Sequence, residues 1–88
     1  MRRRLPLYMV GPGERVEVVE LQGGRGVVGK LHNMGLYPGV KIDVIHNQGV
    51  GPIMVSVDGR RIGLGTGMAF KVIVSRVEGS TGETGRKR

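Results

Sequence analysis

Cysteine is absent from this chain, and the large aromatic side chains that often fix small domains are scarce. The lack of cysteine excludes disulfide bonds and thiolate metal sites, so packing must hold the fold together. With no tryptophan, two tyrosines and one phenylalanine, aliphatic side chains and methionine must build the core. A domain of 88 residues buries only about 60 to 65% of its unfolded surface, which leaves little room for a deep active site.

The chain also lacks the residue set that catalysis requires. It has two histidines and no cysteine, and no segment combines a nucleophile, a base and a residue that orients the base. We therefore expect a binding module and not an enzyme.

Long apolar runs are missing as well, since no stretch approaches the roughly 18 consecutive apolar residues of a membrane span. The segment 1–10 has the basic start of a signal peptide, but its apolar part is too short and contains Pro6. We expect a soluble protein.

Positive charge is plentiful but gathers at the two ends. The net charge is +7, and residues 5–78 hold eight basic and six acidic residues, so most of the excess lies outside them. Residues 1–4 form a basic N-terminal tail, and residues 79–88 form a basic tail without apolar residues that we expect to be disordered. Such tails keep a protein in solution or contact an anionic membrane or nucleic acid loosely.

Alternating apolar residues predict that residues 5–78 form one mainly β domain. After an extended segment in residues 5–10, period-two alternation predicts five strands within residues 15–22, 40–44, 53–57, 60–64 and 70–77. The alternation slips at Val19, which indicates a bulge, and Asp58-Gly59 predicts a two-residue hairpin turn. Because short strands in a flat sheet leave one face and both edges wet, we expect a small barrel of about five antiparallel strands.

One short helix is predicted after the first long strand, over residues 25–34. Its apolar residues recur at helical spacing, and Gly35 can end it in a left-handed conformation. The next three residues, Leu36, Tyr37 and Pro38, are called the hook here. Pro38-Gly39 is a turn that starts the next strand, and Gly13 and Gly59 are expected at two further turns.

The hook has two interpretations. Leu36 can plug the end of the barrel while the Tyr37 hydroxyl makes a capping hydrogen bond. Alternatively, Leu36, Tyr37 and Pro38 project as a compact anchor for a partner protein, with Met34 and Tyr8 extending the apolar surface.

Residues 24–30 match the glycine and lysine spacing of a phosphate-binding loop between a strand and a helix. Leu31 stands where that motif needs a hydroxyl for magnesium, and the remaining length cannot hold a parallel α/β sheet. We expect a tight strand-to-helix connection.

Metal binding has few candidate ligands. Ferrous sites commonly combine imidazoles with a carboxylate, and the candidates here are His32, His46 and Asp43. The two histidines lie on different predicted elements, so solvated surface side chains and a weak site for Fe2+ or another divalent transition metal both stay open. No cofactor is required.

The order of these motifs resembles the FeoA family of small ferrous iron transport accessory proteins. The resemblance runs from about residue 5 to residue 77, and its most specific pieces are Pro12-Gly13-Glu14, residues 31–39, Gly51-Pro52-Ile53 and Ile62-Gly63-Leu64. It implies an SH3-like barrel with a helix between the first strands, similar to the C-terminal domain of iron-dependent repressors of the diphtheria-toxin-repressor type.

The resemblance also implies a function. FeoA proteins are cytoplasmic, non-catalytic partners of FeoB, a membrane transporter with a cytoplasmic GTPase domain, so we expect protein contact at the inner face of the membrane. Membrane contact would be indirect or through the basic tails, and an open sheet edge would allow a homo-oligomer.

Two alternatives stay open. A nucleic-acid-binding small barrel fits the basic tails but not the nearly neutral body or the few aromatic residues, so we expect no nucleic acid. A regulator-like domain of a metal-dependent repressor system would also share the fold.

Overall fold

The computed structural model describes residues 3–77. The predicted C-terminal tail and the first two residues lie outside this range, so the structure does not bear on them.

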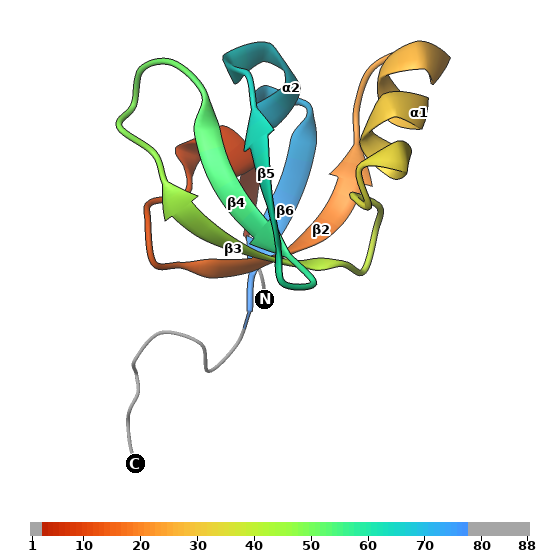
Figure 1. Cartoon of the computed structure of the whole chain (residues 1–88). Coiled ribbons are helices and arrows are strands. Elements are labelled where there is room, and N and C mark those ends of the chain that lie inside the picture. The colour runs from red at the N-terminus through yellow and green to blue at the C-terminus, as the bar shows by residue number, and fades with distance from the viewer. Residues whose placement is uncertain (1–2, 78–88) are drawn as a thin grey trace.

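A six-stranded antiparallel sheet dominates the described residues (Figure 1). Its strands follow the order β1-β6-β2-β3-β4-β5, and no pairing joins β5 to β1 within the described part, so the sheet is strongly bent but open. The strands are β1 (Arg4–Pro6), β2 (Arg15–Leu21), β3 (Lys41–His46), β4 (Ile53–Val57), β5 (Arg60–Leu64) and β6 (Val72–Arg76).

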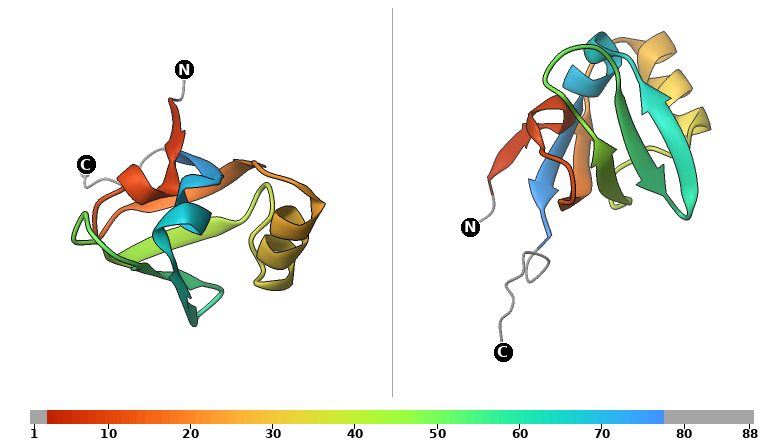
Figure 2. Two further views of the ribbon diagram at one scale, coloured as in Figure 1. Left: turned by 90° about the horizontal axis from the view of Figure 1, so that it is seen from above. Right: turned by 60° about the vertical axis from the view of Figure 1, so that its left-hand side comes forward.

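Two helices and a 3-10 turn complete the fold: η1 (Leu7–Met9), α1 (Arg25–Asn33) and α2 (Thr66–Phe70). Helix α1 stands beside the sheet after β2, and α2 lies across the mouth of the bent sheet near η1 (Figures 1 and 2). No helix among the described residues has the length and apolar character to cross a bilayer.

Alternation of apolar residues along the strands builds a single core. The inward residues of β2, β3, β4 and β6 are almost fully buried, because period-two side chains share one face of a sheet. Helix α1 adds Leu31, and η1 adds Leu7. The mainly β, SH3-like fold expected from the sequence is confirmed.

Bulges bend the sheet at two places. The β2–β6 register shifts between Val18 and Glu20, as the slip at Val19 predicted, and the β3–β4 register shifts between Val44 and His46. An extra residue in one strand increases the local twist, which lets a short sheet wrap around the core.

The structure differs from the expectation at both ends of the domain. Residues 4–6 form a sixth strand, β1, on the free side of β6. Residues 66–70 form α2, where no helix was expected, and the last strand begins at Val72 and not at Phe70. The helical turn buries Ala69 and places the Phe70 ring 4.8 Å from the ring of Tyr8 in a stacked arrangement, and this packing outweighs the strand propensity of Phe70.

The predicted hairpin turn joins β4 and β5. Asp58 and Gly59 have φ angles of 52° and 78°, as a type I′ turn requires at both central positions. Gly13 also has a positive φ, 87°.

Candidate partner-binding site

Helix α1 ends in a Schellman motif that fixes the position of the hook. The amide of Gly35 donates to the carbonyl of His32 at 2.9 Å, and the amide of Leu36 donates to that of Leu31 at 2.9 Å. Gly35 has a φ of 88°, which costs a residue with a Cβ about 1 to 2 kcal/mol. The chain therefore leaves the helix in a single, well-defined direction.

The Schellman motif directs Leu36 into the core. Leu36 and Leu31 are both 0% exposed and belong to the same apolar cluster, because the residue after the left-handed glycine usually packs on the last helical turn. Leu36 is therefore a plug. This placement agrees with the first interpretation of the hook, in which Leu36 fills the end of the core, and corrects the second, in which Leu36 projects as part of an exposed anchor.

Tyr37 and Pro38 form the exposed part of the hook. Tyr37 is 48% exposed, and its ring lies 5.9 Å from that of His32, which is also exposed. The expected capping hydrogen bond from the Tyr37 hydroxyl is not among the hydrogen bonds of the described residues. We call His32, Tyr37 and Pro38 the hook surface; Met34 lies half-buried at its margin.

A tight turn holds the hook surface against the sheet. The amide of Val40 donates to the carbonyl of Tyr37 at 3.1 Å, and Gly39 has a φ of 98°, the pattern of a type II turn with proline first and glycine second. Gly39 also donates to the carbonyl of Val18 at 2.8 Å, and Val18 donates to Val40 at 2.8 Å. The hook surface is thus tied to the bulge of β2.

A surface pocket of about 450 Å³ adjoins the hook surface. Pro38 and Gly39 form one wall, and β1, β2 and β6 supply the others. Ser75 of β6 lies between Arg4 of β1 and Glu17 of β2 in the register of the sheet. We call this the Ser75 pocket.

The hydroxyl of Ser75 is an unusual feature of this pocket. Ser75 is 1% exposed, and its Oγ atom has no hydrogen-bond partner within residues 3–77. A buried hydroxyl without a partner costs about 1 to 3 kcal/mol. Ser75 was not among the residues predicted from the sequence, because its phase on β6, opposite to that of Val74, places it outside the core and gives no sign of its burial.

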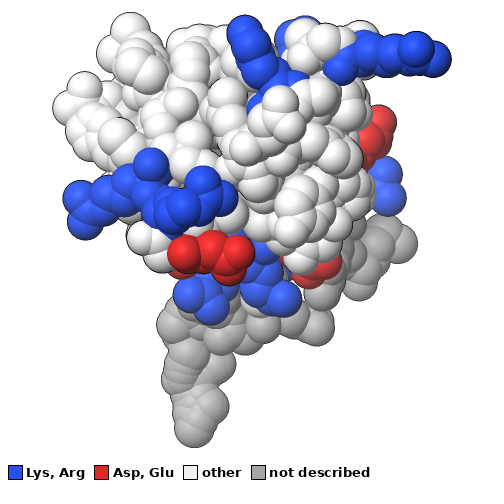
Figure 3. Space-filling model, turned by 45° about the vertical axis from the view of Figure 1, so that its right-hand side comes forward, with Lys and Arg blue, Asp and Glu red and all other residues white. Residues whose placement is uncertain are grey.

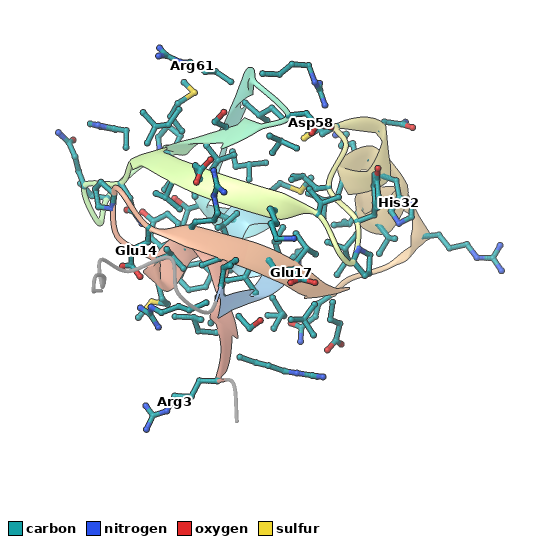
Figure 4. All side chains as sticks on the ribbon, turned by 90° about the horizontal axis from the view of Figure 1, so that it is seen from below. Arg3, Glu14, Glu17, His32, Asp58 and Arg61 are labelled. Atoms are coloured by element: carbon teal, nitrogen blue, oxygen red, sulfur yellow. The ribbon has the colours of Figure 1, made fainter. Side chains whose placement is uncertain are left out.

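Charged side chains around the pocket are of both signs. Arg4 forms an exposed ion pair with Glu20 at 3.8 Å, and Glu17 lies on the lower face of the sheet (Figure 4). On the face that Figure 3 shows, Lys and Arg side chains stand in separate groups, with acidic side chains beside several of them. Such a mixed surface fits a protein partner better than a polyanion, which favours a continuous basic patch.

Tyr8 belongs to the core and not to the hook surface. It is 8% exposed, and its hydroxyl donates to the carbonyl of Gly51 at 2.9 Å. The side-chain amide (Nδ2) of Asn47 donates to the backbone carbonyls of Tyr8 and Val10 at 2.8 and 2.9 Å. The expectation that Tyr8 extends an exposed anchor is corrected, because these bonds and the Phe70 stack hold it in the core.

The candidate metal ligands do not converge. Within the described residues no group of three or more His, Asp or Glu side chains is placed to hold an ion. His32 lies beside Tyr37, and His46 lines an apolar pocket on β3 and β4. Asp43 accepts two hydrogen bonds from Arg15, at 2.8 and 3.2 Å, and this bidentate pair raises the pKa of the Arg15 guanidinium.

The glycine-rich residues 24–30 form the N-cap and most of α1, and the connection from β2 to the helix is short, residues 22–24. Gly24 is the N-cap of the helix and the first turn holds no acidic residue.

Comparisons with known proteins agree with this fold. The FeoA domain family matches residues 5–76. A Methanocaldococcus jannaschii protein named "Putative Fe(2+) transport protein A" is 38% identical over 73 residues, which cover 83% of this chain and 88% of that protein. The crystal structure of an iron uptake regulatory protein (FeoA) superposes with a TM-score of 0.81 at 40% identity, covering 85% of this chain and all of the other.

A more distant neighbour shares the fold alone. A manganese-dependent transcriptional repressor superposes with a TM-score of 0.80 at 16% identity, and the match covers 88% of this chain but 44% of the repressor. Together with the match over residues 5–76 and the 38% identical relative, the architecture shows that this chain belongs to the FeoA domain family.

Proposed function

We propose that this chain is a non-enzymatic accessory protein of ferrous iron transport that acts by contact with a FeoB-type transporter. The contact is made on the cytoplasmic side of the membrane, where the GTPase domain of such a transporter lies. The hook surface and the Ser75 pocket together form the docking site. Membership of the FeoA family and the 38% identical Fe(2+) transport relative support the iron transport role.

The observation that carries the docking site is an exposed aromatic ring next in the chain to Pro38, which borders a pocket that contains a buried hydroxyl without a partner among residues 3–77. Tyr37 is 48% exposed on a rigid turn, and tyrosine is among the residues that most often dominate interfaces. Ser75 lines the same pocket as Pro38, and its buried hydroxyl has no partner within residues 3–77; a small local movement that exposes the hydroxyl would let a polar group of a partner supply the missing hydrogen bond.

Iron is the transported substrate in this proposal, and this chain needs no cofactor. A weak Fe2+ site at His32, His46 or Asp43 stays a separate prediction. Calorimetry with Fe2+ under anaerobic conditions on the His32→Ala/His46→Ala double variant tests it. A heat of Fe2+ binding equal to that of the wild type would exclude both histidines as ligands.

Binding of the full chain to the cytoplasmic part of FeoB tests the proposal. We expect Tyr37→Ala to weaken binding at least about tenfold and Ser75→Ala about fivefold. Met9→Ala is the matched control, because Met9 is 62% exposed in η1 and belongs neither to the hook surface nor to the Ser75 pocket or the apolar pocket on β3 and β4, so its loss should leave the affinity unchanged. Equal affinity of the Tyr37→Ala protein and the wild type would show that FeoB does not dock on the hook surface.

A further inference from the structure

We propose that the open edge of β5 binds an extended, acidic segment of a partner protein, which adds to the sheet as a further strand. The inference goes beyond the proposed function, because it concerns the β5 edge and not the hook surface or the Ser75 pocket.

The two free edges of the sheet differ in their ability to accept a strand. Strand β1 has three residues and ends in Pro6, which lacks the amide that a neighbouring strand requires. Strand β5 has five residues without proline and pairs with β4 alone among the described elements. Figure 4 shows Arg61 of β5 and Arg3 beside β1 at opposite ends of the sheet. The β5 edge is therefore the template for an added strand.

The hairpin register identifies the backbone groups of the β5 edge. Val57 and Arg60 flank the two-residue turn and so form a hydrogen-bonded pair, after which bonded and non-bonded pairs alternate. Ile62 and Leu64 bond to β4 in this pattern, whereas the amides and carbonyls of Arg61 and Gly63 point away from it. These four groups are spaced to bind one extended segment.

Arg61 and Gly63 also share the outer face of the sheet, because they are two residues apart. Gly63 lies opposite Met54, and a Cβ built on it meets nothing within 4 Å. Next to it is a pocket of about 320 Å³ lined mainly by apolar side chains, among them Val50, Pro52 and Met54. A strand paired with β5 can place an apolar side chain over Gly63 and into this pocket.

Charge selects the kind of segment that binds. Neither Arg60 nor Arg61 pairs with a carboxylate among residues 3–77, and Arg60 donates only to the carbonyl of Met34 at 3.3 Å. The arginines of one β5 edge would repel those of a second copy paired with it, so this local charge favours an acidic partner over a second copy of the chain. An antiparallel segment fits when an apolar residue is followed two positions later by Asp or Glu, so that the carboxylate lies opposite Arg61.

A synthetic peptide provides the test with the full chain. The probe is acetyl-Ser-Thr-Leu-Thr-Glu-Thr-Ser-amide, in which leucine and glutamate share one face of a strand. The control, acetyl-Ser-Thr-Leu-Glu-Thr-Thr-Ser-amide, has the same composition but places them on opposite faces. We expect the probe to shift the backbone amide resonances of Arg61 and Gly63 and to bind at least about fivefold more tightly than the control.

Variants of the chain test the two parts of the site separately. Arg61→Glu should weaken the probe about tenfold, whereas Arg25→Glu, the same charge change at an exposed residue of α1, should change it less than about twofold. Gly63→Pro removes one outward amide and should abolish binding, with retained amide dispersion showing that it folds.

Three results would overturn the inference: equal affinity for the two peptides, resonance shifts confined to other strands, or equal effects of the two arginine variants. Tyr37 and Ser75 are not part of this edge, so the two proposals can fail independently. A negative peptide result would not argue against the FeoB contact, and an unchanged FeoB affinity of Tyr37→Ala would not argue against the peptide site.

Discussion

Replacing Gly35 by alanine tests whether the left-handed backbone conformation of this residue positions the hook. Gly35 has a φ of 88°, and a Cβ built there lies 2.6 Å from the Arg60 Nη2 atom. Gly29, which lies inside α1, is the matched control, because a Cβ built on it meets nothing within 4 Å. The two Gly→Ala changes should therefore have effects of opposite sign.

The magnitudes follow from the backbone. A left-handed alanine costs about 1 to 2 kcal/mol, and moving the flexible end of Arg60 adds little. Alanine in place of a glycine inside a helix gains about 0.5 to 1 kcal/mol. One kcal/mol shifts the melting temperature of a domain this size by about 4 to 8 °C, so Gly35→Ala should melt about 5 to 15 °C lower and Gly29→Ala a few degrees higher than the wild type.

Urea denaturation followed by circular dichroism, with thermal melts as a second measurement, gives both free energies of unfolding. The Arg60→Ala/Gly35→Ala double variant separates the two causes: if the backbone dominates, Gly35→Ala costs the same in either background. A Gly35→Ala protein as stable as the wild type would refute the reasoning, because the Schellman motif would not then depend on glycine.

Three further predictions concern side chains. Leu36→Ala should lower the free energy of unfolding by about 2 to 5 kcal/mol in urea denaturation; a loss under about 1 kcal/mol contradicts its role as a plug. Ser75→Ala should be neutral or stabilising by up to about 1 kcal/mol, and clear destabilisation by the same assay would reveal a hydrogen bond of the hydroxyl. The raised pKa of Arg15 means that its pairing with Asp43 contributes fully below the unfolded pKa and is lost only in strong alkali. The stability difference between wild type and Asp43→Asn should therefore stay flat between about pH 6 and pH 9, and a steady change in urea titrations across that range contradicts this assignment.

Local patterns in the sequence predicted much of the fold. Alternation located β2 to β6, with the start of β6 placed two residues too early, the slip at Val19 located the bulge, and Asp58-Gly59 located the hairpin turn. Each depends on neighbouring residues only, so a single sequence contains the information.

Elements that depend on distant contacts were not predictable in the same way. Strand β1 is too short to show a period and exists because it pairs with β6. Helix α2 depends on the stack between Phe70 and Tyr8, which are far apart in the chain. The open edge at β5 likewise follows from which strands pair, and no local pattern reports it.

The candidate site was predicted in part. The order helix, glycine, hook was visible, and the Schellman rule could have indicated that Leu36 is buried while Tyr37 is exposed. The burial of Ser75 could be recognised only in the structure, because it results from neighbouring residues on β1 and β2.

The central claim is that this chain supports ferrous iron uptake through partner contact at the hook surface. Fe2+ uptake by its own host cells, lacking this chain and supplied with the wild type, Tyr37→Ala or Met9→Ala protein at equal levels, tests it most directly. We predict that the wild type and Met9→Ala restore uptake and that Tyr37→Ala does not. Full restoration by Tyr37→Ala, or undiminished uptake without the chain, would contradict the account.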